Sequence, residues 1–216
     1  MARSLKQWPG VFAGAVILIG TSAASAWGQS PDPRRESFQL QSTTFANDQF
    51  LPISMIFNNP VNGINTCSIN GARGANASPE LSWTGTPPGT RSFVVVTYDV
   101  TAAFTHWGMY NIPGTATGLP ENAGVAGSPY GAQVYNDFYI LPEYDGPCPP
   151  ANVAPYVHQY VFTVYALDIG LQLPGSTNFP ANAETLYQAL IKAGQEGHIL
   201  ASASLTGLYS TTATSR

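Results

Sequence analysis

The sequence predicts a mostly-β protein with one helix near its C-terminus. Short runs rich in β-branched and aromatic residues alternate with Gly, Pro and Asn, which is the pattern of strands separated by turns. Apolar residues recur convincingly at helical spacing in one segment, and one isolated helix does not fit an alternating α/β architecture. Together these two observations favour a β core with peripheral helical structure.

The N-terminal segment has the layout of a secretory signal peptide. The basic residues Arg3 and Lys6 precede an apolar stretch at 11–20, and the small residues at 24–26 form a cleavage site. The apolar stretch is shorter than the roughly 20 residues that a transmembrane helix needs, although an uncleaved anchor is the alternative. We therefore predict a signal peptide at 1–26, export to the periplasm or the medium, and no stable membrane insertion.

The mature chain is expected to form one domain. Residues 27–36 are polar and contain two prolines, so they are predicted to be a flexible lead-in to a domain at 37–216. The strand candidates, strongest first, are 93–98, 106–112, 160–167, 38–42, 81–84 and 199–209. The first and third are nearly continuous in apolar residues, which suits strands covered on both faces. A helix is predicted after Asn182, its N-cap, and ends near Gly194.

The charge and the cysteines restrict the function. Without the signal peptide, acidic residues outnumber basic residues two to one, which disfavours nucleic acid and anionic membrane surfaces as partners. Any anionic ligand must then be captured by a local pocket. Cys67 and Cys148 are predicted to form a disulfide, the usual state of a cysteine pair in an exported chain. The alternative is a reactive Cys148 thiolate near His158.

Four polar residues lie at strand ends and are the candidates for a site. His106 and His158 each open a predicted strand, Asp99 ends another, and Tyr160 shares a strand face with His158 while Gln159 points to the opposite face. An Asp, two His and a Tyr can orient imidazoles and present donors to an oxyanion.

Several interpretations of these four residues remain open. They could form a satisfied buried hydrogen-bond network without a ligand, or two histidines and a carboxylate could hold a metal. A nucleophile served by His158 would need a strained elbow such as Gly-x-Ser-x-Gly, and the sequence contains none. His198 follows the predicted helix and is interpreted as a packing or capping residue.

A series of motifs occurs in a recognisable order along the chain. They are Ser78-Pro79-Glu80-Leu81-Ser82-Trp83, Tyr98-Asp99, His106-Trp107, Asn111-Ile112-Pro113, Asn136-Asp137-Phe138, Gly146-Pro147-Cys148-Pro149-Pro150, the run from His158 to Asp168, Gly197-His198-Ile199-Leu200-Ala201 and Leu205-Thr206-Gly207. This order resembles that of the phosphatidylethanolamine-binding protein family, and the last two motifs resemble its bacterial branch, often called Raf-kinase-inhibitor-like. The resemblance covers about 37–209.

The resemblance implies a β-sandwich of antiparallel sheets with a few peripheral helices and a small pocket for phosphate, acetate or phosphorylated head groups. It places the family's pocket residues on Asp99, His106, His158 and Tyr160. It also places a Gly/Pro-rich pocket wall on 146–150, so that Gly146 and Pro147 are expected to contact the ligand.

The chain departs from the family pattern at three places. Residues 100–103 replace the usual Pro-Asp-x-Pro that follows the pocket Asp, which predicts a less acidic and less rigid rim. Gln159 stands where an Arg is common and points away from the pocket. Residues 68–77 form a longer Gly/Asn-rich insertion than usual.

These observations lead to a functional hypothesis with two rivals. We expect a non-enzymatic binding protein without cofactor or metal, in which neutral His106 and His158 donate to a small anionic or phosphorylated ligand. Asp99 fixes their tautomer and Tyr160 adds a hydroxyl. The first rival is a protein-interaction module that acts through surface loops, because the family includes kinase and protease inhibitors. The second rival is a metal-assisted hydrolase that uses the same residues.

Overall fold

The computed structural model describes residues 37–212 of the chain. The predicted signal peptide at 1–26 and the predicted lead-in at 27–36 lie outside the described residues, as do residues 213–216. Between residues 37 and 212, no helix combines the length and the apolar character needed to cross a bilayer.

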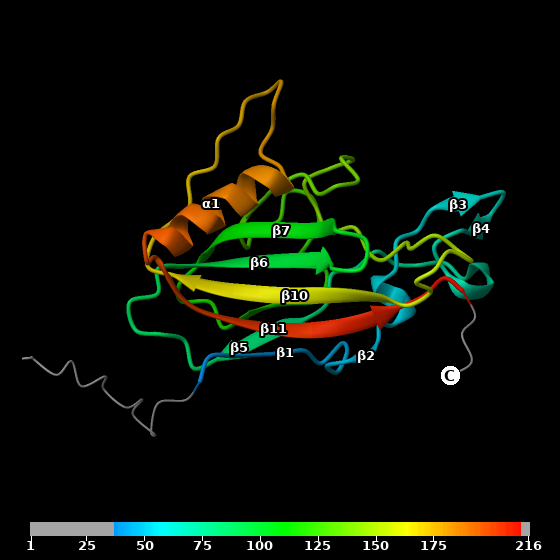
Figure 1. Ribbon diagram of the computed structural model, residues 1–216, viewed down its shortest axis with the longest axis horizontal. Helices are drawn as coiled ribbons and strands as arrows, with labels where there is room; N and C mark the ends of the chain where they lie inside the picture. Colours follow the sequence, from blue (N-terminus) through cyan, green and yellow to red (C-terminus); the bar gives the residue numbers. More distant parts are fainter. Residues whose placement is uncertain (1–36, 213–216) are drawn as a thin grey trace, which may run out of the picture. The chain divides into compact units, whose positions relative to one another are not determined.

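The described strands form one large sheet, one small sheet and a two-stranded hairpin (Figure 1). The large sheet has the order β2 (Gln49–Phe50), β11 (Ile199–Tyr209), β10 (His158–Leu167), β6 (Ser92–Asp99), β7 (Phe104–Pro113) and β9 (Ala132–Gln133). The small sheet has the order β1 (Gln39–Gln41), β5 (Leu81–Thr84) and β8 (Gly118–Leu119), and the hairpin joins β3 (Pro60–Val61) to β4 (Ile64–Asn65). Neighbouring strands are antiparallel except β2 and β11, which run parallel.

The main hydrophobic core lies between the large and small sheets. The small sheet contributes Leu40, Leu81, Trp83 and Leu119, and the large sheet contributes Phe93, Val95, Trp107, Met109, Phe162 and Val164. Every one of these side chains is buried. Burial of apolar area on this scale is the main favourable term in folding, at about 25 cal/mol per Å².

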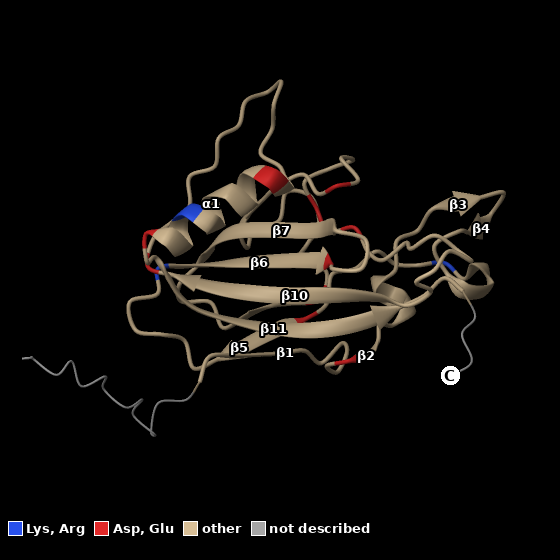
Figure 2. Ribbon diagram, in the orientation of Figure 1, with Lys and Arg blue, Asp and Glu red and all other residues tan. Residues whose placement is uncertain are grey.

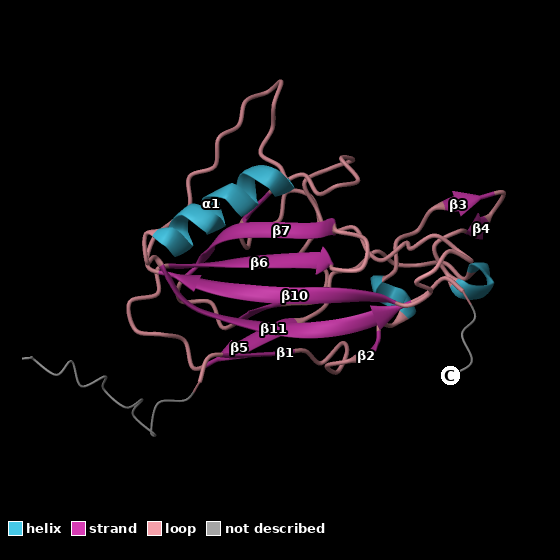
Figure 3. Ribbon diagram, in the orientation of Figure 1, coloured by secondary structure: helices cyan, strands magenta, loops and turns pink. Residues whose placement is uncertain are grey.

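A second, smaller core lies on the opposite face of the large sheet, beneath α1 (Ala183–Gln195). Figure 3 shows this helix running alongside the sheet. Along β6, Phe93 and Val95 point into the main core, whereas Val94 and Val96 pack beneath the helix. This alternation explains the continuous apolar run in β6, because both faces of the strand are covered.

The ends of α1 are fixed by hydrogen bonds to its terminal backbone groups. Asn182 Oδ1 accepts from the Thr185 amide at 3.0 Å, and Thr185 Oγ1 accepts from the Asn182 amide, which is a capping box. At the other end Gly197 has a φ of +79°, and the His198 amide donates to the Ala193 carbonyl. This is a Schellman motif, which satisfies carbonyls that the last turn leaves free.

The predicted elements are present, with one correction. All six strand candidates match β6, β7, β10, β1, β5 and β11, and the predicted helix is α1. The expectation that β10 is covered on both faces is wrong. Its inner face is buried, but Val161 and Thr163 are only half-buried, because α1 packs mainly against β7 and β11 and leaves this side of β10 in a shallow groove.

The predicted disulfide between Cys67 and Cys148 is present in the structure. It links the segment that follows β4 to a loop that precedes β10, with a sequence separation of 81 residues. In the chain-entropy model a loop of this length stabilises the folded state by about 4 to 5 kcal/mol. Because both cysteines are oxidised, the alternative of a reactive Cys148 thiolate does not apply to this state.

Candidate functional site

Three strands of the large sheet bring the predicted polar residues together at one end of the sheet. Asp99 is the last residue of β6 and lies opposite Tyr160 of β10 in the strand register. His158 is the first residue of β10, and His106 lies near the start of β7. His106, His158 and Tyr160 face the same side, and their rings are neighbours: the Tyr160 ring centroid lies 5.1 Å from that of His106 and 6.4 Å from that of His158.

The Asp99 carboxylate is buried and fully engaged. Its Oδ1 accepts from the amides of Thr101 and Ala102, at 2.8 and 3.1 Å, so the turn after β6 wraps around it. Its Oδ2 lies 2.6 Å from Nδ1 of His158, and both side chains are almost completely buried. A carboxylate can only accept, so Nδ1 of His158 carries the proton and donates it.

His106 is oriented by a backbone carbonyl. Its Nδ1 lies 2.7 Å from the carbonyl oxygen of Asp145 and must donate to it, since a carbonyl has no hydrogen. Burial lowers the pKa of His106 below its ordinary value, against weaker opposing effects of this hydrogen bond, of the Asp99 and Asp145 carboxylates and of the Gly146 backbone. The ring is therefore neutral at physiological pH.

The fixed Nδ1 protons correct the expected role of the two histidines. A neutral imidazole has one N–H, and both His106 and His158 use it within the protein. The second nitrogen, Nε2, is then a lone-pair acceptor on both rings. The expectation that the neutral rings donate to a ligand is wrong for this geometry.

Tyr160 and Cys148 supply donors instead. The Tyr160 hydroxyl is enclosed and has no hydrogen bond of normal geometry, although the nearby Asp99 carboxylate adds to the effect of burial in raising its pKa. Cys148 carries the one backbone N–H in the run Pro147-Cys148-Pro149-Pro150, and that N–H has no protein partner within the described residues. Both residues line the same cavity.

The cavity is small and partly enclosed, with a volume of about 260 Å³. It is lined by Asp99, Ala102, Phe104, His106, Phe138, Cys148, Pro149, Pro150, His158 and Tyr160. Two of the expected contact residues, Gly146 and Pro147, are not in this lining. Gly146 packs instead against the backbone of the 3₁₀ helix Ile53–Met55, where an added Cβ would collide with the Met55 carbonyl oxygen.

A buried amide network that the sequence analysis missed holds the pocket wall in place. The Asp145 carboxylate accepts from Asn76 Nδ2 at 3.0 Å and from Asn136 Nδ2 at 2.8 Å. Asn76 Oδ1 in turn accepts from the Gly146 amide. The sequence analysis named Asn136 only as part of a family motif and gave it no role. It did not link Asn76 to Asp145, because these residues lie in two loops whose sequences have no periodic pattern.

No Lys or Arg side chain of residues 37–212 lines the cavity. Among the residues that the structure describes, Lys and Arg occur only as Arg73, Arg91 and Lys192, and none of them lines it. Figure 2 shows how sparse the charges are over the sheets. Recognition of a ligand here would depend on hydrogen bonds rather than on a positive field.

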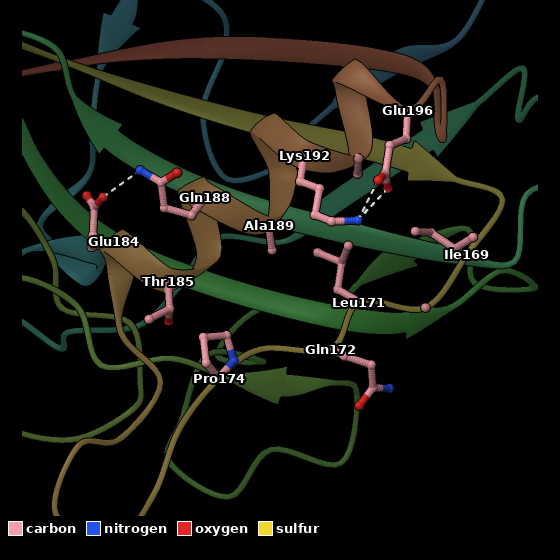
Figure 4. Close-up of a pocket in the computed structure, with 12 residues that line it drawn as sticks. Ile169, Leu171, Gln172, Pro174, Glu184, Thr185, Gln188, Ala189, Lys192 and Glu196 are labelled. Atoms are coloured by element: carbon pink, nitrogen blue, oxygen red, sulfur yellow. Dashed lines mark hydrogen bonds and ion pairs between the residues drawn. The ribbon is translucent and has the colours of Figure 1, made fainter.

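A larger cavity of about 550 Å³ lies between α1 and residues 169–174 (Figure 4). Its charged side chains are already paired, because Glu184 accepts from Gln188 and Lys192 binds Glu196. It offers no unpaired polar group comparable to the Tyr160 hydroxyl. The smaller cavity is therefore the better candidate for a site.

The remaining predicted groups are accounted for as follows. His198 caps α1 through its backbone and lies 2.8 Å from Asp168 through Nδ1, far along the chain from the cavity residues. No cluster of three or more His, Cys, Asp or Glu side chains within residues 37–212 is arranged to hold a metal ion. Gln159 is exposed on the other side of β10, as its position in the strand predicted.

Fold and cavity together define a β-sandwich with a small His/Asp pocket at one end of its large sheet. The sequence profile of the phosphatidylethanolamine-binding protein family matches residues 41–210. The chain therefore belongs to the phosphatidylethanolamine-binding protein family.

Individual relatives agree with this assignment. A UPF0098 protein of Methanothermobacter thermautotrophicus is 44% identical over 142 residues, covering 63% of this chain and 84% of that protein. The crystal structure of Escherichia coli YbcL, described as a new member of the mammalian PEBP family, aligns with a TM-score of 0.62 and 30% identity, covering 81% of this chain and 99% of that one. A family homologue from Chlamydia trachomatis aligns with a TM-score of 0.59 and 26% identity, covering 80% and 97% of the two chains.

Proposed function

We propose that the protein is an exported, non-enzymatic binding protein whose pocket holds a phosphate-like anion or a phosphorylated head group. The observation that carries this proposal is the Cys148 backbone N–H, which has no hydrogen-bond partner among the described residues and belongs to a residue that lines the pocket. Buried polar groups are nearly always paired, so an unpaired donor at a cavity wall favours a ligand over a closed structural network.

The geometry around the hydroxyl supports a ligand of phosphate size. Asp99 and the Asp145 carbonyl hold the two imidazoles in fixed orientations, and the proline-rich wall supplies the free Cys148 N–H. Groups that are oriented in advance lose little conformational entropy when a ligand binds. The cavity of about 260 Å³ suits a small head group rather than an extended chain.

The proposal assigns no nucleophilic role to the residues that line the pocket. Both cysteines are in the disulfide, and the sequence contains no Gly-x-Ser-x-Gly elbow. The rival metal-assisted hydrolase is tested by elemental analysis of the purified mature protein. Stoichiometric zinc or iron would favour the hydrolase over the binding protein.

Ligand titration monitored by NMR of the histidine ring protons tests the binding function directly. Inorganic phosphate and phosphoethanolamine are expected to shift the signals of His106 and His158 at millimolar concentration, with His198 as an internal control at the other end of the sheet. If His106 and His158 do not respond to either compound, the small-anion proposal is wrong.

A protein-interaction role is the second candidate, and exposed apolar side chains favour it. Tyr139, Ile140 and Leu141 form a consecutive exposed run, and Phe179 in a nearby loop is 81% exposed. Double substitution of Ile140 and Leu141 by Ser should abolish a partner effect that acts through this surface. Substitution of His106 and His158 by Ala should abolish only effects that require the pocket.

A further inference from the structure

The hydrogen-bond pattern of the pocket restricts the chemistry of its ligand. Both Nδ1 protons are donated within the protein, His158 to Asp99 and His106 to the Asp145 carbonyl. Both Nε2 atoms are therefore acceptors as long as the rings are neutral. The candidate donors for a ligand are the Cys148 N–H, which has no partner among the described residues, and the Tyr160 hydroxyl, which is enclosed beside the Asp99 carboxylate.

A fully deprotonated oxyanion can accept hydrogen bonds from the donors of the pocket, but it cannot donate one to the Nε2 acceptors. Its oxygens could accept from Tyr160 and Cys148, but an oxygen placed against Nε2 of His106 would set lone pair against lone pair. A ligand that also carries a hydroxyl can donate to Nε2. A phosphomonoester in its monoanionic form has both kinds of oxygen on one phosphorus, since one oxygen keeps its proton.

We propose that the pocket binds phosphomonoesters in their protonated, monoanionic form, with the P–OH group donating to Nε2 of His106, and discriminates against phosphodiesters and sulfate esters. This inference rests on the anion-binding function proposed above. It follows that an intact phospholipid, whose phosphate is a diester without a P–OH proton, is a poorer ligand than a free phosphorylated head group.

The electrostatic surroundings of the pocket favour a monoanion over a dianion. The titratable groups around it are Asp99 from β6, His158 and Tyr160 from β10, Tyr209 from β11, and Asp137, Tyr144 and Asp145 from the loop before the pocket wall. Three of these groups are carboxyl groups, and no Lys or Arg lines the cavity within the described residues. Because burial lowers the pKa of His106, that ring does not supply the proton near neutral pH.

Three small compounds separate the effect of the ligand's P–OH proton from the effects of its charge and its shape. Methyl phosphate loses its second proton at a pKa of about 6, whereas methyl sulfate and dimethyl phosphate are permanent monoanions without a proton. Isothermal titration calorimetry of the mature protein, at pH 5.5 to 8.0 and in two buffers of different ionisation enthalpy, gives the dissociation constants and the number of protons taken up.

We expect methyl phosphate to bind at least tenfold more tightly than methyl sulfate or dimethyl phosphate at pH 5.5. Above pH 6 the dissociation constant of methyl phosphate should rise about tenfold per pH unit, with uptake of one proton, because the binding form becomes scarce. If all three probes bind equally, without proton uptake for methyl phosphate, the protonated-ligand inference is wrong while the anion pocket stands. Methyl sulfate carries no proton of its own, so if it binds with uptake of a proton, that proton is bound by a histidine ring of the protein. The protonated-ligand inference would then also be wrong.

Failure of methyl phosphate to bind at any pH would instead refute the proposed function and this inference together. A variant adds an independent check. His106→Gln offers an amide N–H in place of the lone pair and should bind methyl sulfate at least tenfold more tightly than the wild type, whereas His198→Gln should change nothing. If His106→Gln does not fold, the comparison of the three compounds on the wild type still tests whether the bound ligand is protonated.

Discussion

The protein has two His–Asp pairs, one at each end of β10. The two pairs consist of the same residue types but differ in burial and in their hydrogen-bond partners. His158 and Asp99 meet at the start of the strand with Nδ1 and Oδ2 2.6 Å apart, and Asp168 and His198 meet beyond its end at 2.8 Å. The side chains of the first pair are 8% and 3% exposed, and those of the second pair are 35% and 39% exposed.

The difference between the pairs teaches that surroundings, not residue types, make a site. Asp99 is also held by two backbone amides, and His158 lies beside the unpaired Tyr160 hydroxyl in a cavity. Asp168 and His198 join the end of a strand to the end of a helix and face solvent. A solvent-exposed polar pair contributes little to stability, whereas removal of one partner of a buried pair leaves the other without a hydrogen bond and costs much more.

The largest expected effect comes from the crosslink that exists only at the pocket end. Replacing both cysteines by serine (Cys67→Ser with Cys148→Ser) should lower the free energy of unfolding by about 4 to 5 kcal/mol, because the unfolded chain regains the entropy of the closed loop. Denaturant unfolding of the variant and the oxidised wild type measures this. Ligand affinity of the folded variant should also fall, since the Cys148 N–H is no longer held in place.

Removing the buried aspartate should have the next largest effect. Asp99→Ala leaves two backbone amides and the His158 N–H without a partner, and we expect a loss of about 3 to 5 kcal/mol in the free energy of unfolding. Loss of ligand-dependent shifts at His158 should accompany it in the NMR titration. A loss below about 1 kcal/mol would show that the buried pair behaves like the exposed one.

Tyr160→Phe should separate ligand binding from stability. The hydroxyl lies beside the Asp99 carboxylate but makes no hydrogen bond of normal geometry, so its removal should leave the free energy of unfolding unchanged or raise it slightly. The dissociation constant for methyl phosphate should rise about three- to tenfold, as for the loss of one hydrogen bond of about 1 kcal/mol. A clear destabilisation without change in affinity would assign the hydroxyl a structural role.

The smallest effect is expected at the exposed pair. Asp168→Ala should change the free energy of unfolding by less than about 1 kcal/mol, and the change should shrink further at high salt. Ligand affinity should not change, because this pair lies at the other end of β10. Paired with Asp99→Ala under the same conditions, this variant serves as the matched control for the comparison.

Much of the fold and part of the site could be predicted from local patterns. Strand alternation placed His158 and Tyr160 on one face and Gln159 on the other, and helical spacing with Asn182 as N-cap located α1. The short strands β2, β3, β4, β8 and β9 were not predicted, because two residues carry no measurable periodicity.

The pocket wall could not be predicted from local sequence patterns. The resemblance implied ligand contacts at Gly146 and Pro147, but the cavity lining takes Cys148, Pro149 and Pro150 from this segment instead. The anchoring of Asp145 by Asn76 and Asn136 likewise depends on loops that meet only in the folded chain.

The sequence by itself determined the β architecture, the helix, the cysteine pair and the residue types at the strand ends, because periodicity and composition act locally. The tertiary structure decided which nitrogen of each imidazole keeps its proton. That choice depends on the acceptor that reaches Nδ1, which for His106 is the carbonyl of Asp145 from a distant loop. Such an acceptor cannot be read from a residue's neighbours along the chain, and it sets what the pocket can bind.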